Sequence, residues 1–162
     1  MKPFRRLLIA AAALLLSGCE PGPTPILYGS DACAHCKMTI VDRHFGAQVV
    51  HAHGRTWSFD SVECLVAYEI AGSIAAEDVH SRWVTPFGSP ETLMPAEAAV
   101  YLVSESLRSP MGMNLSAHSD TAEARRALAR HGGELKSWAE LTPLVRAAWF
   151  AGNRSSENGQ GS

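Results

Sequence analysis

The sequence predicts an α+β fold made of two ββαβ repeats that pack together, followed by a C-terminal helix. Two strand-rich segments, 47–59 and 98–117, are each followed by a helix-start signature and then by a glycine that ends the helix. These features recur at an offset of 60 residues, in the pairs Asp60 and Asp120, Glu63 and Glu123, and Gly72 and Gly132. Because the sheet of each repeat has an open face, we expect the two halves to cover each other.

The first repeat is expected to contain strands at 47–53 and 56–59 and a helix that is capped by Asp60 and ends at Gly72. A third strand follows in 79–86, where a tryptophan precedes a Thr-Pro pair. This order of elements defines the ββαβ unit.

The second repeat is expected to contain strands at 98–103 and 113–117 and a helix at 120–132. Its third strand lies in 135–143, which again carries a tryptophan and then Thr-Pro, and a final helix covers about 143–150. The core is expected to include all four tryptophans, which are Trp57, Trp83, Trp138 and Trp149.

The amino-acid composition is that of a globular protein, and it argues against several classes of function. Hydrophobic residues make up 46% of the 162-residue chain and charged residues 19%. A net charge of −2 provides no basic excess to neutralise phosphates, which argues against nucleic-acid binding. Four cysteines are too few for a disulfide-rich scaffold. The chain also lacks the G-x-S-x-G, P-loop and H-E-x-x-H motifs.

The first residues are typical of an export signal. Three basic residues precede an apolar run at 7–16, which is too short to cross a bilayer of about 30 Å as a permanent helix. The run leads into Leu16-Ser17-Gly18-Cys19, which resembles a bacterial lipobox, where the signal is removed before a lipid-modified cysteine. We therefore expect a lipoprotein that is anchored in the membrane through Cys19 and faces the periplasm, and Glu20 favours the outer over the inner membrane.

Domain boundaries follow from composition. We expect a signal peptide at 1–18, a lipid-anchored Pro-rich tether at 19–25, a folded domain at 26–151 and a disordered tail at 152–162. The repeat divides the folded domain into halves of about 26–90 and 91–151.

The densest group of soft donor atoms is the segment 33–38, where Cys33 and Cys36 have C-x-x-C spacing and Met38 follows. Thiolate and thioether ligands select Cu(I) over harder ions, whereas a zinc site needs four Cys or His donors. The segment therefore favours copper. A structural disulfide between the two cysteines and a thioredoxin-like redox pair remain alternatives, because both also use closely spaced cysteines.

A second group of candidates surrounds the Ser109-Pro110-Met111-Gly112 segment. Met111 lies on the loop side of the second hairpin, where its thioether could approach the cysteines, although methionines are usually core residues. Met113, which is expected to open the next strand, and His118, just beyond that strand, are weaker candidates. Cys64 is interpreted as a core residue of an amphipathic helix.

Together these motifs resemble the NosL family of nitrous oxide reductase accessory lipoproteins. The resemblance rests on the lipobox, Cys-x-x-Cys-x-Met at 33–38, Phe59-Asp60 with Cys64, Ser109-Pro110-Met111-Gly112, and the later Leu128, His131-Gly132-Gly133 and Trp138. It extends over most of the chain after the signal. The family fold, two ββαβ halves related to part of organomercurial lyase, agrees with the repeat.

The resemblance implies a Cu(I) chaperone rather than an enzyme. Such a protein would deliver copper for the catalytic copper-sulfide centre of nitrous oxide reductase in denitrifying bacteria, through a membrane-associated maturation complex. By position, Cys36 and Met38 are the firmest implied ligands and Met111 comes next, while Cys33 is less constant in the family. Lys37 departs from the pattern, because the family usually has glycine there. A monomer and a homodimer both remain open.

An enzyme is the alternative function. A thiol oxidoreductase would use the cysteines in redox exchange. An organomercurial-lyase-like enzyme would use them to bind mercury beside a carboxylate that protonates carbon. Cys36 and Cys64, with Asp31 or Asp60, would supply these groups, but no motif ties them together.

Overall fold

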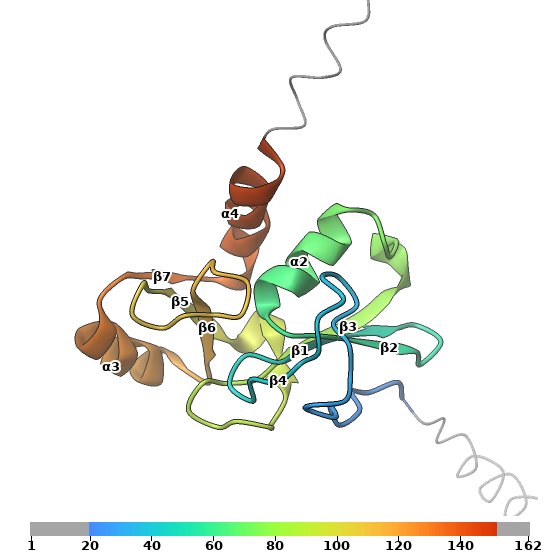
Figure 1. The fold of residues 1–162 in the computed structure, drawn as a ribbon, viewed down its shortest axis with the longest axis horizontal. Coiled ribbons are helices and arrows are strands. Elements are labelled where there is room, and N and C mark those ends of the chain that lie inside the picture. Colours follow the sequence, from blue (N-terminus) through green and yellow to red (C-terminus); the bar gives the residue numbers. More distant parts are fainter. Residues whose placement is uncertain (1–19, 152–162) are drawn as a thin grey trace, which may run out of the picture.

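The computed structural model describes residues 20–151, which form two halves with a sheet each (Figure 1). The first half contains β1 (Ala47–His51), β2 (Thr56–Phe59), α2 (Val62–Ile70), β3 (Val79–Val84) and the short β4 (Met94–Pro95). The second half contains β5 (Val100–Val103), β6 (Leu115–His118), α3 (Thr121–His131) and β7 (Glu134–Lys136), and α4 (Trp138–Trp149) follows. Short 3-10 helices at Ala76–Asp78 and Ala96–Ala98 precede β3 and β5.

The two sheets share one topology, which confirms the predicted pair of ββαβ units. In the first sheet β1 lies between β2 and β3, and in the second β5 lies between β6 and β7. All of these neighbours are antiparallel. In each half the helix connects the second strand to the third. β4 extends only the first sheet, beside β3.

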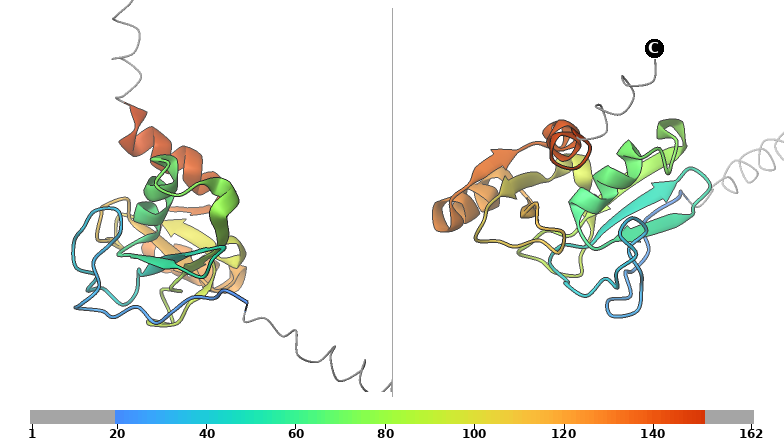
Figure 2. Two further views of the ribbon diagram at one scale, coloured as in Figure 1. Left: turned by 90° about the vertical axis from the view of Figure 1, so that its right-hand side faces the viewer. Right: turned by 45° about the horizontal axis from the view of Figure 1, so that its top comes forward.

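One hydrophobic core joins the halves. Phe59 from the first half and Tyr101 and Leu141 from the second belong to the same cluster, and each is fully buried. α2 packs beside α4, as Figure 2 shows from two directions. Just after β3, Pro86 forms a parallel bridge with Ala117 of the second sheet. The halves therefore form one folded unit, as expected.

The helix-cap prediction is correct for α3 and wrong for α2. Asp120 caps α3 by accepting a hydrogen bond from the backbone N–H of Glu123 at 2.7 Å. α2 begins instead after Ser61, with no side-chain cap. Asp60 accepts hydrogen bonds from the side chains of Cys36 and Ser61. Its carboxylate is therefore directed at the cysteine segment and not at the helix terminus.

The last helix begins earlier than predicted. α4 starts at Trp138, where Ser137 and Glu140 form a capping box, and Pro143 lies inside the helix rather than at its start. The second Trp and Thr-Pro pattern is therefore not equivalent to the one that begins in β3, and the third strand of the second half is confined to β7.

The four tryptophans are only partly buried, and three of them, Trp57, Trp138 and Trp149, pack against the core cluster as expected, whereas Trp83 does not belong to that group. An indole is seldom fully buried because it is large and carries an N–H that needs a partner. That of Trp83 donates to the Ser81 hydroxyl at 2.9 Å.

The predicted signal peptide at 1–18, the lipidated Cys19 and the tail at 152–162 lie outside the described residues. Among the residues from 20 to 151, no helix is long and apolar enough to cross a membrane. In the predicted tether, the backbone N–H of Thr24 donates to the side chain of Gln48 at 2.8 Å. The chain is thus already held against β1 at that point.

Candidate metal centre

The segment 31–40 folds into a small hairpin whose tip carries both cysteines of the C-x-x-C motif. At its base the Ile40 N–H donates to the Asp31 carbonyl at 2.9 Å, and the tip begins where the Cys33 N–H donates to the Met38 carbonyl at 2.8 Å. The tip closes at Lys37, whose N–H donates to the Cys33 carbonyl at 3.0 Å and whose φ is 68°. Glycine adopts this left-handed backbone at no steric cost, whereas lysine does not.

The hairpin lies against the end of β2 and the start of α2. The Ala34 N–H at its tip donates to the Ser58 carbonyl at 2.9 Å, two residues before Asp60. Cys64 follows in the first turn of α2. This short stretch therefore presents a carboxylate and a third thiol to the two cysteines of the hairpin.

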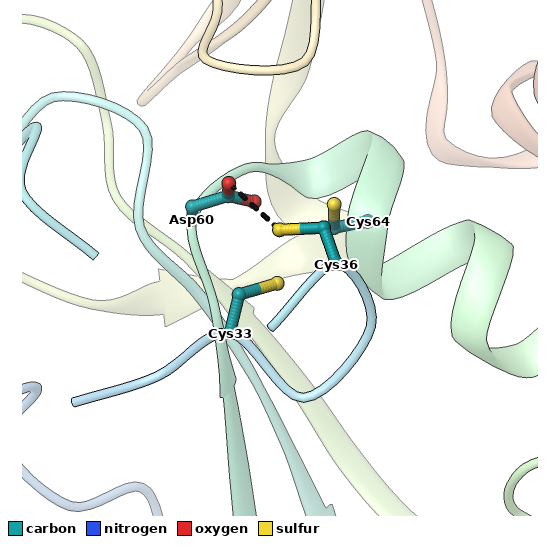
Figure 3. A group of neighbouring side chains, drawn as sticks. All are labelled: Cys33, Cys36, Asp60 and Cys64. Atoms are coloured by element: carbon teal, nitrogen blue, oxygen red, sulfur yellow. Dashed lines mark hydrogen bonds between the residues drawn. The ribbon is translucent and has the colours of Figure 1, made fainter. Parts of the chain in front are cut away.

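Four side chains from these two segments form one group, here called the thiol group (Figure 3). The donor atoms of Cys33, Cys36, Asp60 and Cys64 all lie within 4.8 Å of one another. The Cys36 thiol donates to Oδ2 of Asp60 at 3.2 Å. All three cysteines are free thiols. The structure thus unites the predicted C-x-x-C pair with two donors from a distant part of the sequence.

Two donors of the thiol group, Asp60 and Cys64, are not among the ligands expected from the sequence. Asp60 lacks the capping role assigned to it. Cys64 is fully buried, as expected of a core residue, yet its thiol meets that of Cys33. Asp60 ends the segment that follows β2 and Cys64 lies in the first turn of α2, so a spacing of only four residues across a helix start is the signal that points to them.

The three thiols differ in acidity. A hydrogen bond from Cys64 lowers the pKa of Cys33 to about 6, and the same bond raises the pKa of Cys64. Burial is the main cause that raises the pKa of Cys36 to about 12, and its hydrogen bond to Asp60 acts in the same direction. Of the three thiols, that of Cys33 therefore loses its proton most readily. Two further protons must leave if all three sulfurs bind a metal ion.

The sulfur donors are graded from the interior to the surface. Cys33 and Cys64 are fully buried, and Cys36 is partly exposed. Met38, which pairs with Cys33 across the hairpin, has 59% of its surface exposed. Cys36 and Met38 are therefore the sulfur atoms of this segment that are accessible from solvent.

The loop that carries Met111 approaches the start of α2. Met111 is partly buried and packs against the core cluster that contains Cys33 and Cys64. At the base of the loop the Ser109 hydroxyl donates to the carboxylate of Glu63, the residue before Cys64. The structure thus brings the predicted thioether loop to the helix that supplies the third thiol.

The two weaker candidates differ in position. His118 is buried in β6, with Nε2 at 3.1 Å from the Ser116 hydroxyl and Nδ1 at 3.6 Å from a carboxylate oxygen of Glu123. It does not belong to the thiol group. Met113 packs against the same core as Met111, but it precedes β6, which starts only at Leu115, and does not open the strand as expected.

Three sulfurs and one carboxylate suit two kinds of metal ion. Thiolates are soft donors that prefer Cu(I). Three cysteines and an aspartate also meet the four-donor requirement of tetrahedral zinc, which the C-x-x-C motif alone does not supply. Thioether donors from Met38 and Met111 would favour copper, because zinc gains little from them.

The sequence model of the NosL family matches residues 25–145 of this chain. The chain belongs to the NosL family. Among solved structures it is similar to the crystal structure of the copper chaperone NosL from Shewanella denitrificans. The TM-score is 0.65 at 17% sequence identity, over 76% of this chain and 98% of that one. The comparison with curated proteins found no match.

The NosL match confirms the expected family, and the paired sheets confirm the expected α+β architecture. The matched range contains the cysteine hairpin, the Asp60–Cys64 stretch and the Met111 loop, whereas Cys19 precedes it. At 17% identity the NosL crystal structure supports the fold. The choice of ligands rests on the donors of this chain.

Proposed function

We propose that this NosL chain is a lipid-anchored, periplasm-facing Cu(I) metallochaperone that supplies copper for the catalytic copper centre of nitrous oxide reductase. The thiol group carries the proposal, because three free cysteine sulfurs converge where only one of them is partly exposed. Membership of the NosL family and the copper chaperone named in the matched structure support the same cargo.

Copper is held in this proposal by sulfur donors. Cys36, Met38 and Met111 are the primary ligands, and Cys33 supplies a thiolate from beneath them. Cys64 provides a further sulfur from α2. A set of thiolates and thioethers selects Cu(I) over Zn(II), since Cu(I) is the softer ion.

During delivery of copper, the exposed sulfur donors are replaced before the buried ones. Met38 is the most exposed donor and is the first to be replaced by a sulfur of the acceptor protein. Cys36 follows, because it is the one thiol of the group that is partly exposed. The buried sulfurs of Cys33 and Cys64 are the last of the donors to release the ion. Transfer therefore proceeds by stepwise ligand exchange, without release of free copper.

The proposed anchor restricts where this exchange takes place. Several acyl chains on Cys19 would hold the protein stably at a membrane. Thr24 already contacts the first sheet, so the free tether reaches at most about 18 Å. Acceptors must therefore come close to the membrane surface, which fits delivery to membrane-associated maturation machinery in denitrifying bacteria. The identity of Glu20 favours the outer membrane.

Anaerobic Cu(I) titration tests the proposal. The full chain carries Cys19→Ser, so that the lipobox thiol does not compete, and a chromophoric Cu(I) chelator reports free copper. We expect one tightly bound Cu(I) per chain that excess Zn(II) does not displace. Failure to withdraw Cu(I) from the chelator, or displacement of Cu(I) by zinc, would overturn the proposal.

The hydrogen bond between Cys36 and Asp60 favours a second candidate, an organomercurial-lyase-like activity. In that reaction the Cys36 thiol gives its proton to the Asp60 carboxylate as its sulfur binds mercury, and Asp60 then passes this proton to the departing carbon. The carbon–mercury bond is thereby replaced by carbon–hydrogen and sulfur–mercury bonds. Release of benzene from a phenylmercury salt, lost in Asp60→Asn while Cu(I) binding persists, would support it. No benzene from the unmodified chain would reject it.

A thiol oxidoreductase is the remaining enzymatic alternative, and the neighbouring free cysteines Cys33 and Cys36, of which Cys36 is partly exposed, favour it. Reduction of a disulfide-bonded substrate by the metal-free chain tests this activity. Turnover that stops in Cys33→Ser would support it, and no turnover would reject it.

A further inference from the structure

Glu63 is a fully buried carboxylate that the proposed copper chemistry does not use. It lies in the first turn of α2, between Asp60 and Cys64, and none of its surface is exposed. One carboxylate oxygen, Oε1, accepts a hydrogen bond from the Ser109 hydroxyl. The other, Oε2, has no hydrogen-bond partner among the described residues.

Ser109 connects the two ends of the loop that carries Met111. Its hydroxyl donates to Glu63 and also accepts a hydrogen bond from the Asn114 N–H at 2.8 Å. Its carbonyl accepts from the Gly112 N–H at 3.1 Å. The serine therefore closes the loop on itself and fastens it to α2 through a single oxygen atom.

The hydrogen bond between Ser109 and Glu63 connects the Met111 loop to the helix that carries Cys64. α2 is a regular helix, so the carboxylate of Glu63 is held at a fixed position relative to the Cys64 thiol in the next residue. A loop fastened to Glu63 is therefore fixed relative to the thiol group. Met111 lies in the middle of that loop, two residues after Ser109.

A buried carboxylate at this position is costly. Burying a polar group without a full set of partners is unfavourable, and an apolar side chain would pack here without that penalty. The stability of α2 therefore does not account for Glu63, whereas the hydrogen bond to Ser109 does.

We propose that Glu63 and Ser109 are positioning residues that hold the Met111 thioether beside the thiol group, an inference that rests on the proposed Cu(I) site. They do not contact copper. They fix the distance between a ligand on the second hairpin and the ligands on α2 and the cysteine hairpin, so that Cu(I) binds without first ordering the loop. The loss of conformational entropy from ordering the Met111 loop then occurs when the chain folds and does not weaken the binding of Cu(I).

Cu(I) affinity in a double-mutant cycle tests the proposal, in the full chain with Cys19→Ser. Ser109→Ala and Glu63→Ala should each weaken Cu(I) binding by about threefold to tenfold, the worth of one buried hydrogen bond. Glu63→Gln keeps a carbonyl oxygen that accepts from Ser109 and should bind as the parent does. In a Met111→Ala background, Ser109→Ala should have no further effect, because the ligand that it positions is gone.

X-ray absorption at the copper edge measures how many sulfur atoms bind the copper ion, and a general loss of stability would not change that number. Ser109→Ala should lose one sulfur from the copper shell, as Met111→Ala does, while circular dichroism shows an unchanged fold. An unchanged affinity in Ser109→Ala, or a loss that persists in the Met111→Ala background, would overturn the inference. A parent chain that binds no Cu(I) would instead overturn the chaperone proposal itself.

Discussion

Cys36 and Asp60, 24 residues apart in the sequence, meet through a hydrogen bond of 3.2 Å from the thiol to Oδ2. The backbone bond from Ala34 to Ser58 fastens the cysteine hairpin to the end of β2, directly beside this contact. The cysteine hairpin and the stretch from the end of β2 into α2 therefore hold the thiol group together.

Replacing Lys37 by glycine should stabilise the metal-free fold. The φ of 68° is strained for lysine and unstrained for glycine, so Lys37→Gly should gain up to about 1 kcal/mol. Urea unfolding measures the change. Thr39→Gly, an exposed position in the same hairpin, is the matched control and should lower the midpoint. A lower midpoint for Lys37→Gly would show that its ammonium bond to the Ala34 carbonyl outweighs the strain.

Glu63 should make the stability of the fold depend on pH. Burial raises its pKa from the ordinary 4.5 to about 7. Because the folded chain holds this proton more tightly than the unfolded chain, the stabilisation is fully present below about pH 4.5 and is lost as the pH rises through 7. The Glu63→Gln variant cannot ionise. The free energy of unfolding of Glu63→Gln, taken relative to that of its parent, should therefore rise by about 2–3 kcal/mol from pH 5 to pH 8.

Urea unfolding of both proteins at the two pH values measures this difference, and groups other than Glu63 cancel in the comparison. A stability difference that is equal at pH 5 and pH 8 would show that Glu63 titrates at its ordinary value.

Met38 should contribute to copper binding but not to stability. Its side chain is 59% exposed, so Met38→Ala costs little packing. Loss of one thioether ligand should weaken Cu(I) binding by about tenfold, or about 1.4 kcal/mol. Leu27→Ala is the matched control, since Leu27 is an apolar side chain with the same exposed fraction, 59%. Chelator competition measures both variants, and equal affinities for the two would remove Met38 from the ligand set.

Cys19 should determine where the protein resides in the cell. The lipobox predicts that Cys19→Ser either releases the chain to the soluble fraction or blocks its processing. Cell fractionation with detection of the chain in each fraction measures the outcome. Membrane association that remains unchanged, with normal processing, would show that the anchor lies elsewhere.

The fold was largely predictable because its signals are local. Alternating strands, a cap at Asp120 and a glycine at the end of α3 each depend on neighbours in the sequence. The paired topology followed from their repetition. The start of α4 was missed because Thr-Pro imitates a helix start, whereas the capping box of Ser137 and Glu140 marks the actual one.

The site was less predictable because it is assembled by contacts between distant segments. The Asp60-x-x-Glu63 pattern is a sound local signature for a cap, and only the docked hairpin turns Asp60 toward Cys36 instead. Cys64 has apolar neighbours in the sequence. A cysteine that only fills the core and a cysteine whose thiol meets other thiols both have such neighbours, so the sequence alone does not distinguish them. The cysteine segment and the Met111 loop are candidates from their soft donor atoms alone, and the family resemblance ranks Cys36, Met38 and Met111 first among them.

The central claim is that Cys36 binds Cu(I), and the affinity of Cys36→Ser tests it most directly. Cys36 is intermediate in exposure between Met38 and the buried sulfurs of Cys33 and Cys64. Its loss should therefore remove a copper ligand and also a step of the proposed ligand exchange. Anaerobic chelator competition should show a larger loss of Cu(I) affinity for Cys36→Ser than for Met38→Ala or Met111→Ala, with circular dichroism unchanged. Cu(I) binding by Cys36→Ser as tight as that of the parent would contradict the account.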